Sequence, residues 1–438
     1  MIKKLLFSSL PLFMFVNISL AQATLEAIEP DYRRSSLHTI LLESQDFPNK
    51  ETVLKAYYNA KFPDNYNNHN IGEKTFKYSD YKLTEQERID AEVNKTGAGK
   101  AIASLGSNLT AGIMDSLAAD YPIIIDKYLK DKQIAKKMVA KWFNRQEDGT
   151  FDTKLIAKRG QYDASALKVS EANNSARGTN MLSDAGMELI DKTFLTVSRV
   201  NFVSNEIVAK AIYLAALEAA KELPMGQGLA NKAAEKVYNK TKEGYSVWTT
   251  TYLYKLKWND SIESAFYKDL WIDEENFDAA KKTAFDNSEL FELEFIGDEK
   301  STSLVTFSLK KRTEKQIISL STVRNVDAVF AKLQKKYDVF KPMVPLLTGR
   351  PITAKIGMKE GLEGGEKFEV LEVVQDPDTG LSSYERVGTV KVDKKSIWDN
   401  RYNLADGEEA LDEDSALDRT TFKGGKKYLP GMLIRQIK

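Results

Sequence analysis

The sequence contains no cysteine. This absence excludes disulfide bonds, thiolate metal sites and a cysteine nucleophile. It also excludes attachment to a membrane through a lipid on a cysteine of this chain. Chemistry or anchoring must therefore come from other residue types.

Histidine is nearly absent as well, since His38 and His69 are the only two. An imidazole general base or a two-histidine metal centre would have to be built around them. Their surroundings are typical of ordinary loop or surface histidines. We therefore predict no catalytic, cofactor-binding or metal-binding residue, and no resident cofactor.

The chain has no excess charge of either sign. Lys plus Arg and Asp plus Glu both number 63, which gives a formal net charge of +0. No global field would attract nucleic acid or anionic lipid, so we expect no nucleic-acid partner. The hydrophobic fraction of 42% is ordinary for a globular chain.

The N-terminus carries a short, mainly apolar run. Two lysines precede the run from Leu5 to Leu20, which ends in Ala21-Gln22-Ala23. This order of charged, apolar and small residues is typical of a cleavable secretory signal peptide. The run is diluted by Pro11 and is shorter than the ~20 apolar residues of a membrane span. We predict that residues 1–23 are removed, that the protein lies in the periplasm or cell envelope, and that no integral membrane segment remains.

The rest of the chain divides into three parts. Residues 24–89 are rich in aromatic residues and asparagine, and predict an irregular N-terminal lead with one short helix at Glu51–Ala60. Residues 90–341 predict a helical and α+β middle domain. Residues 351–438 predict a small β-barrel domain.

Local patterns predict the elements of the middle domain. Strands are expected where β-branched and aromatic residues gather, at Thr193–Val203, Tyr245–Trp258, Phe291–Ile296 and Ser303–Leu309. A turn is expected at Asp298–Lys300. Helices are expected within Thr84–Phe143, which begins with a capping box, and at Ser175–Ile190, Glu206–Leu223 and onward to about Lys240.

The clearest amphipathic helix is predicted over Ser321–Phe340. Its apolar side chains recur every three or four residues, while Lys332, Gln334 and Lys335 point away. A seam of this length is expected to pack on a sheet. The seam consists of Val323, Val326, Phe330, Leu333, Tyr337 and Phe340.

Prolines and glycine mark a change of character after this helix. Pro342, Pro345 and Gly349-Arg350-Pro351 predict a linker. Beyond it, Phe368–Val374 and Tyr384–Val392 predict two strands of a hairpin. The pattern therefore indicates a separate β domain.

Two glycine-containing segments resemble nucleotide-binding loops but lack required residues. Gly97-Ala98-Gly99-Lys100 has Asn94 where a phosphate loop needs its first glycine, and Ala101 where it needs a hydroxyl. Gly226-Gln227-Gly228 follows a helix and has Asn231 in place of the third glycine of a dinucleotide fingerprint. Neither segment predicts a nucleotide site.

Carboxylates are plentiful but unplaced. Asp376-x-Asp378-x-Gly380 begins like a calcium loop, yet Leu381 and Val387 stand where that loop needs glycine and glutamate, which favours a hairpin turn. A glycosidase needs two facing carboxylates, and sequence spacing cannot identify such a pair. Asp273-Glu274-Glu275 and the stretch Asp406–Asp418 are typical of solvated loops.

The segment Ile207–Leu217 is apolar except for Lys210. It is too short to span a membrane. Membrane insertion and partner binding are alternatives, but such a helix is usually part of a core. We therefore expect a buried core helix.

One part of the middle domain resembles a group of uncharacterised secreted proteins of Bacteroidetes-type bacteria. The similarity implies an envelope location and no particular activity. It is carried by Trp142-Phe143-Asn144-Arg145, Asp148-Gly149-Thr150-Phe151, Arg159-Gly160-Gln161-Tyr162-Asp163-Ala164, Arg177-Gly178 and Leu182-x-Asp184-Ala185-Gly186-x-Glu188-Leu189-Ile190.

The C-terminal region resembles the small β-barrel domain of flagellar assembly protein T. The similarity is to a pattern of glycines and strands, and it implies a fold more than a function. It is carried by Ala354-Lys355-Ile356-Gly357, Gly361-Leu362-x-x-Gly365-x-x-Phe368-x-Val370, Val387-Gly388-Thr389-Val390 and Pro430-Gly431-Met432.

These observations predict an α+β multidomain protein whose helical and αβ middle region is followed by a small C-terminal β-barrel domain. We expect a secreted, non-catalytic envelope protein that binds or scaffolds other envelope proteins. The alternatives are a carboxylate-based glycan hydrolase and a small-ligand or lipid carrier. A deep cleft with facing carboxylates would favour the hydrolase, and an elongated apolar cavity would favour the carrier.

Overall fold

The structure is a computed structural model of the 438-residue chain. The residues that it describes are 33, 35–43, 47–88, 120–163, 189–222, 224–242, 244–305, 313–375, 382–401, 417–425 and 428–437. It contains both helices and strands, as the sequence predicted, and a closed β-barrel at the C-terminal end.

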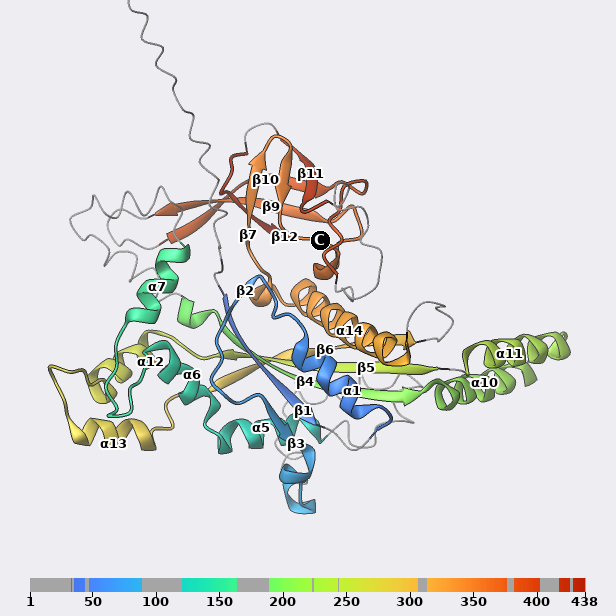
Figure 1. Ribbon diagram of the computed structural model, residues 1–438, viewed down its shortest axis with the longest axis horizontal. Helices are drawn as coiled ribbons and strands as arrows, with labels where there is room; N and C mark the ends of the chain where they lie inside the picture. The colour runs from blue at the N-terminus through green and yellow to red at the C-terminus, as the bar shows by residue number, and fades with distance from the viewer. Residues whose placement is uncertain are drawn as a thin grey trace, which may run out of the picture.

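A mixed six-stranded sheet forms the body of the molecule (Figure 1). Its order is β2-β1-β4-β5-β6, with β3 also beside β1. β1 is parallel to β2, β3 and β4, whereas β4, β5 and β6 are antiparallel. The strands are β1 (Ser35–Glu43), β2 (Tyr66–Asn68), β3 (Thr75–Lys77), β4 (Thr193–Ser204), β5 (Tyr245–Leu256) and β6 (Leu293–Val305).

Strand β1 corrects the prediction of an irregular lead over residues 24–89. The short helix expected there is confirmed as α1 (Lys50–Asn59), but β1 lies in the interior of the sheet between β2 and β4. Leu37 and Leu41 pack on one face of the sheet, and Ile40 and Leu42 pack on the other. A strand buried on both faces shows no apolar–polar alternation, so the period-two signal was missing.

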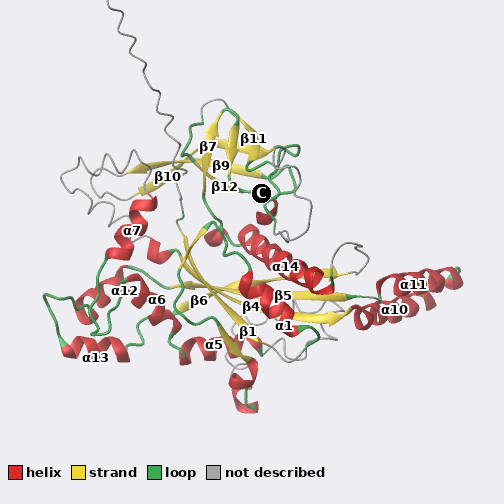
Figure 2. Cartoon of the chain, in the orientation of Figure 1, coloured by secondary structure: helices red, strands yellow, loops and turns green. Residues whose placement is uncertain are grey.

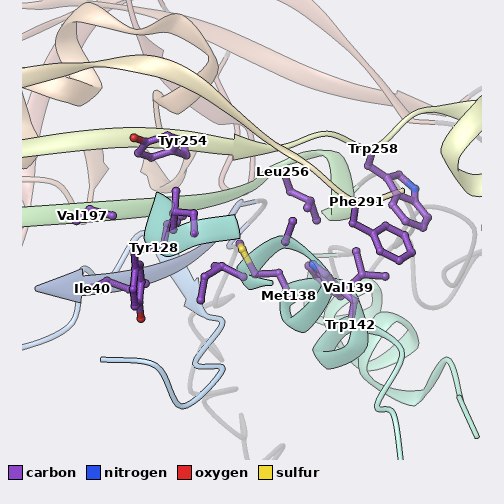
Figure 3. Packing of buried hydrophobic residues seen from close by; sticks show 14 of the residues in the cluster. Ile40, Tyr128, Met138, Val139, Trp142, Val197, Tyr254, Leu256, Trp258 and Phe291 are labelled. Atoms are coloured by element: carbon purple, nitrogen blue, oxygen red, sulfur yellow. The ribbon is translucent and has the colours of Figure 1, made fainter. Parts of the chain in front are cut away.

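Helices cover both faces of the sheet. α1 and α14 (Glu314–Lys336) pack on the face that includes Phe194 and Val247. The helices on the other face include α5 (Tyr121–Asp131), α6 (Ile134–Trp142), α12 (Asp260–Ala265), the short helical segment η2 (Phe266–Leu270) and α13 (Ala279–Asn287). Figure 3 shows Met138 and Trp142 of α6 below the strand that carries Val197, in the same cluster as Ile40.

The helical region predicted over Thr84–Phe143 is described at its two ends. Its capping box is confirmed, because the Glu87 backbone N–H donates to Thr84 Oγ1 and the Thr84 N–H donates to the Glu87 carboxylate. Residues 89–119, and residues 175–188 of another predicted helix, lie outside the described residues.

α14 confirms the predicted packing of an amphipathic helix on the sheet. Val323, Val326, Phe330 and Leu333 are all buried. The prediction that Gln334 points away was wrong, since its side chain is buried and its Nε2 donates to the hydroxyl of Tyr66.

The helix begins before the predicted Ser321, at a capping box formed by Thr313 and Gln316. We expect Thr313→Ala to lower the free energy of unfolding by about 1 kcal/mol, because one N-terminal N–H group loses its acceptor. Urea unfolding followed by circular dichroism measures this change. Ser319→Ala, inside the same helix, is the control and should be neutral or slightly stabilising, since alanine is the better helix former. Equal effects of the two substitutions would contradict the capping role.

Strand β6 corrects the prediction of two short strands separated by a turn. It is continuous from Leu293 to Val305, and Asp298, Glu299 and Lys300 are each paired with β5. β6 is an edge strand, where charged side chains can reach solvent or a neighbour. Glu299, for example, forms a 2.6 Å ion pair with Lys336 of α14. The charges that suggested a turn therefore belong to an extended edge.

The C-terminal strands close into a barrel in the order β10-β11-β8-β7-β12-β9, apart from the sheet in Figure 2. The linker prediction was wrong, because β7 occupies most of residues 342–351 and the barrel begins at Val344 rather than at 351. Pro345 lies within β7, opposite Leu433. The strands are β7 (Val344–Gly349), β8 (Ile352–Ala354), β9 (Lys367–Gln375), β10 (Ser382–Val392), β11 (Thr420–Gly424) and β12 (Leu433–Gln436).

Two helices connect β4 to β5 and project beyond the sheet as a hairpin (Figure 1). They are α10 (Asn205–Lys221) and α11 (Gln227–Thr241), and both confirm predicted helices. The two helices contact each other along their length. Within the described part of the chain, no helix combines the length and apolar character that a membrane crossing needs.

Candidate functional site

His69 is buried and fully engaged by its neighbours. Its Nε2 lies 2.9 Å from the carbonyl oxygen of Met138, and its Nδ1 lies 3.0 Å from a guanidinium nitrogen of Arg159. Because Arg159 can only donate, Nδ1 accepts and Nε2 donates. Burial, with the positive charge of Arg159, lowers the pKa of His69 to about 3. The ring therefore stays neutral and has no nitrogen available as a base.

His38 has a comparable structural role on β1. Its Nε2 donates to the carbonyl oxygen of Glu73 over 2.6 Å, and burial lowers its pKa to about 4. The expectation of loop or surface histidines was wrong for His38, which lies in β1, whereas His69 does lie in a loop, directly after β2. Neither histidine is on the surface. Among the described residues, no group of three His, Asp or Glu side chains has the arrangement of a metal site.

Arg159 of α7 (Lys154–Asp163) is the centre of this buried polar network. Its guanidinium donates to Ser36 Oγ over 2.9 Å and to the Asn68 carbonyl oxygen over 3.2 Å, and it lies 4.5 Å from the ring centre of Trp142. Trp142 Nε1 in turn donates to Thr193 Oγ1 over 2.8 Å. The network connects α6 and α7 to β1 and β4. These hydrogen bonds indicate that Arg159 has a structural role.

The segments that resemble nucleotide or calcium loops divide into two groups. Residues 94–101 and 376–381, and the acidic stretch up to residue 416, lie outside the described residues. Gly226 has φ of 90° and precedes α11 at the tip of the hairpin, where a left-handed conformation favours glycine. Asp273 accepts the backbone N–H groups of Glu275 and Asn276, which is the role of a turn residue.

Two half-buried carboxylates lie where α14 meets the barrel. Burial raises the pKa of Asp327 to about 6, with Lys359 opposing the shift and Glu360 adding to it. Glu360 belongs to the short helix η4 (Met358–Glu360), which contacts α14. Burial also raises the pKa of Glu360, although Asn400 Nδ2 and the Gly357 N–H both donate to its carboxylate. Sequence spacing carried no signal for this pair, which comes from two distant segments.

The hairpin of α10 and α11 corrects the prediction of a buried core helix. Ile207, Ile212 and Leu214 of α10 are 55%, 47% and 53% exposed, and Met225 and Leu229 near the tip are 87% and 78% exposed. The physical reason lies in the strands. β4 and β5 stay paired up to Ser204 and Tyr245, so the inserted helices leave from the end of the strand pair rather than from a face of the sheet.

The hairpin is therefore the candidate binding surface of the protein. A helix that is apolar on nearly all sides is usually covered by other elements. Large exposed apolar surfaces mark interaction sites in soluble proteins. The sequence signal was present, as an apolar run between two strands, but its meaning depended on the pairing of those strands.

Comparison with known proteins does not assign the chain to a family. No family model matches the chain, and no curated protein is significantly similar to it.

Proposed function

We propose that this is a secreted, non-catalytic protein of the cell envelope that binds or scaffolds other envelope proteins through the α10–α11 hairpin. The observation that carries the proposal is the exposure of large apolar side chains on a projecting helix pair. Docking through helices needs no catalytic group, and it explains why an apolar helix lies outside the core.

The envelope location rests on the sequence of the N-terminus, where a charged start and an apolar run end in Ala21-Gln22-Ala23. N-terminal sequencing of the chain from an osmotic-shock fraction should begin near Thr24. Recovery of the uncleaved chain in carbonate-washed membranes would contradict this location.

A hairpin deletion tests the binding role directly. Ser204 and Tyr245 are register partners at the end of β4 and β5. Replacing residues 205–244 with Asn-Gly should therefore join the strands through a two-residue turn and leave the body folded. We expect the tagged full chain to retain envelope proteins in stoichiometric amounts after purification from its native envelope, and the deletion variant to lose them. The idea fails if a folded deletion variant retains the same proteins.

The alternative, a glycan hydrolase, is favoured by one observation. A general acid needs a raised pKa, and Asp327 beside Glu360 has this property. Incubation of the purified chain with envelope and plant glycans tests it. Hydrolysis that disappears in Asp327→Asn would support this alternative over a purely binding role.

A further inference from the structure

The hairpin has two sides that differ in character. Burial and helix spacing assign the contact between its helices to Ala209, Tyr213, Ala216 and Ala220 of α10, and Ala230, Ala234 and Tyr238 of α11, all at least half-buried. The rings of Tyr213 and Tyr238 lie 5.3 Å apart in this contact.

One side of the hairpin is apolar, and we name it the hairpin face. It consists of the residues one position before six of the seven contact residues, namely Ile212, Ala215 and Ala219 of α10 and Leu229, Ala233 and Val237 of α11. All are exposed, with Ile212 at 47% and Leu229 at 78%. Because the helices are antiparallel, the same offset from the contact row places both rows on the same side of the pair.

The composition of the hairpin face matches the contact between α10 and α11. Both consist of rows of alanine with a few larger side chains. The small alanine side chains allow two helices to approach closely. The hairpin face includes no Trp or Phe, the residues that commonly anchor helices in a membrane interface. Its chemistry therefore fits another helix pair better than a lipid surface.

Charges at the two borders of the face identify the partner. Exposed Glu218 and Glu222 border the α10 row on its outer side, and exposed Lys236 and Lys240 border the α11 row. A two-fold axis parallel to the helices would place α10 of one copy over α11 of the other. Each acidic border would then lie beside a basic border. An anionic membrane would be attracted by the basic border and repelled by the acidic border, so it offers no such complement.

We propose that the hairpin face binds the same face of a second copy of this chain and forms a four-helix bundle. This inference rests on the proposed role of the hairpin as a binding surface and adds a second copy of the chain to its partners. α11 has 15 residues, so a face of two helices about 22 Å long buries on the order of 900 Å² in total for two copies. This area is below that of a standard stable interface, so the dimer is weak and reversible.

Sedimentation equilibrium of the purified mature chain tests the proposal over a concentration range of about 1 to 300 µM, where an interface of this size dissociates. Ile212→Glu should raise the dimer dissociation constant at least about tenfold, because it places a charge in the buried face. Leu214→Glu is the matched control. Leu214 follows Tyr213 in the sequence, as Ile212 precedes it. Leu214 is similarly exposed, at 53%, but lies on the opposite side of the hairpin.

A charge exchange identifies the borders. Reversing both glutamates, in Glu218→Lys with Glu222→Lys, should weaken the dimer, because both borders are then basic. Adding Lys236→Glu and Lys240→Glu should restore it, because the borders are complementary again. If the first two substitutions only disturbed the structure of the hairpin, Lys236→Glu and Lys240→Glu would not restore the affinity of the dimer.

Three outcomes would overturn the proposal. The first is a chain that stays monomeric over the whole concentration range. The second is an equal weakening of the dimer by Ile212→Glu and Leu214→Glu. The third is binding of phosphatidylglycerol vesicles to the monomer through the hairpin face. If the chain is monomeric while the hairpin deletion still loses envelope partners, the proposed function stands and only this inference fails. Thermal unfolding of each variant establishes that it is folded.

Discussion

Arg159→Met should lower the free energy of unfolding by about 3–5 kcal/mol. The guanidinium supplies donors to the buried Ser36 Oγ and His69 Nδ1, and to the carbonyl oxygen of the exposed Asn68. Methionine fills much of the same volume but donates no hydrogen bond, so Ser36 Oγ and His69 Nδ1 would remain buried with a partner missing. Such a loss is a large fraction of the stability of a typical domain.

Urea unfolding followed by tryptophan fluorescence measures the effect, since Trp142 lies against the guanidinium. Lys158→Met, the exposed neighbour on α7, is the matched control and should change stability by less than about 0.5 kcal/mol. Arg159→Lys should lie between the wild type and Arg159→Met, because one ammonium group cannot reproduce the planar fork. A loss below about 1 kcal/mol for Arg159→Met would show that the network contributes little.

Asp327→Asn should stabilise the protein above neutral pH and have little effect near pH 4. The pKa of Asp327 is about 6 in the folded protein, above the ordinary value of 3.8. As pH rises between these values, the unfolded chain releases its proton first, so the folded state loses stability until the pH exceeds 6. The amide cannot ionise and escapes this loss. Two pKa units correspond to about 3 kcal/mol, which is the upper limit of the expected gain at pH 8.

Thermal unfolding at pH 4 and pH 8 separates this effect from a general change in packing. The charged groups that act on Asp327 are Arg324 on its own helix, Lys359 and Glu360 of η4, and Asp64. Asp338→Asn is the control, because Lys341 lowers the pKa of Asp338 and its loss should not stabilise the protein at pH 8. A pH-independent change in Asp327→Asn would mean that this carboxylate is not held protonated.

The sequence predicted best those elements whose patterns are local. β4 and β5 are marked by β-branched and aromatic residues, and α14 is marked by apolar residues every three or four positions, so each could be recognised alone. β1 was missed because its apolar residues face both sides of the sheet. β6 was divided because its three charges were interpreted as a turn, although an edge strand tolerates them.

The candidate site was found in part. The apolar run from Ile207 to Leu217 was recognised, and partner binding was one of its interpretations. Its exposure depended on the register of β4 and β5, which local sequence does not specify. Asp327 and Glu360 could not be paired from sequence, because they lie on separate elements that meet only in the folded chain.

The position of β1 has a consequence for the order in which the chain can fold. Near its N-terminal end the chain supplies β1, α1, β2 and β3, which can associate as soon as they have been made. The other edge of β1 pairs with β4, where Ser36 lies opposite Thr193. Until β4 is available, that edge presents unpaired backbone groups beside buried-type side chains, the arrangement that most readily pairs with a foreign strand. A chain that leaves the ribosome or a membrane channel N-terminus first therefore keeps this edge of β1 unpaired until β4 has emerged. During that interval a holding chaperone would protect the edge most.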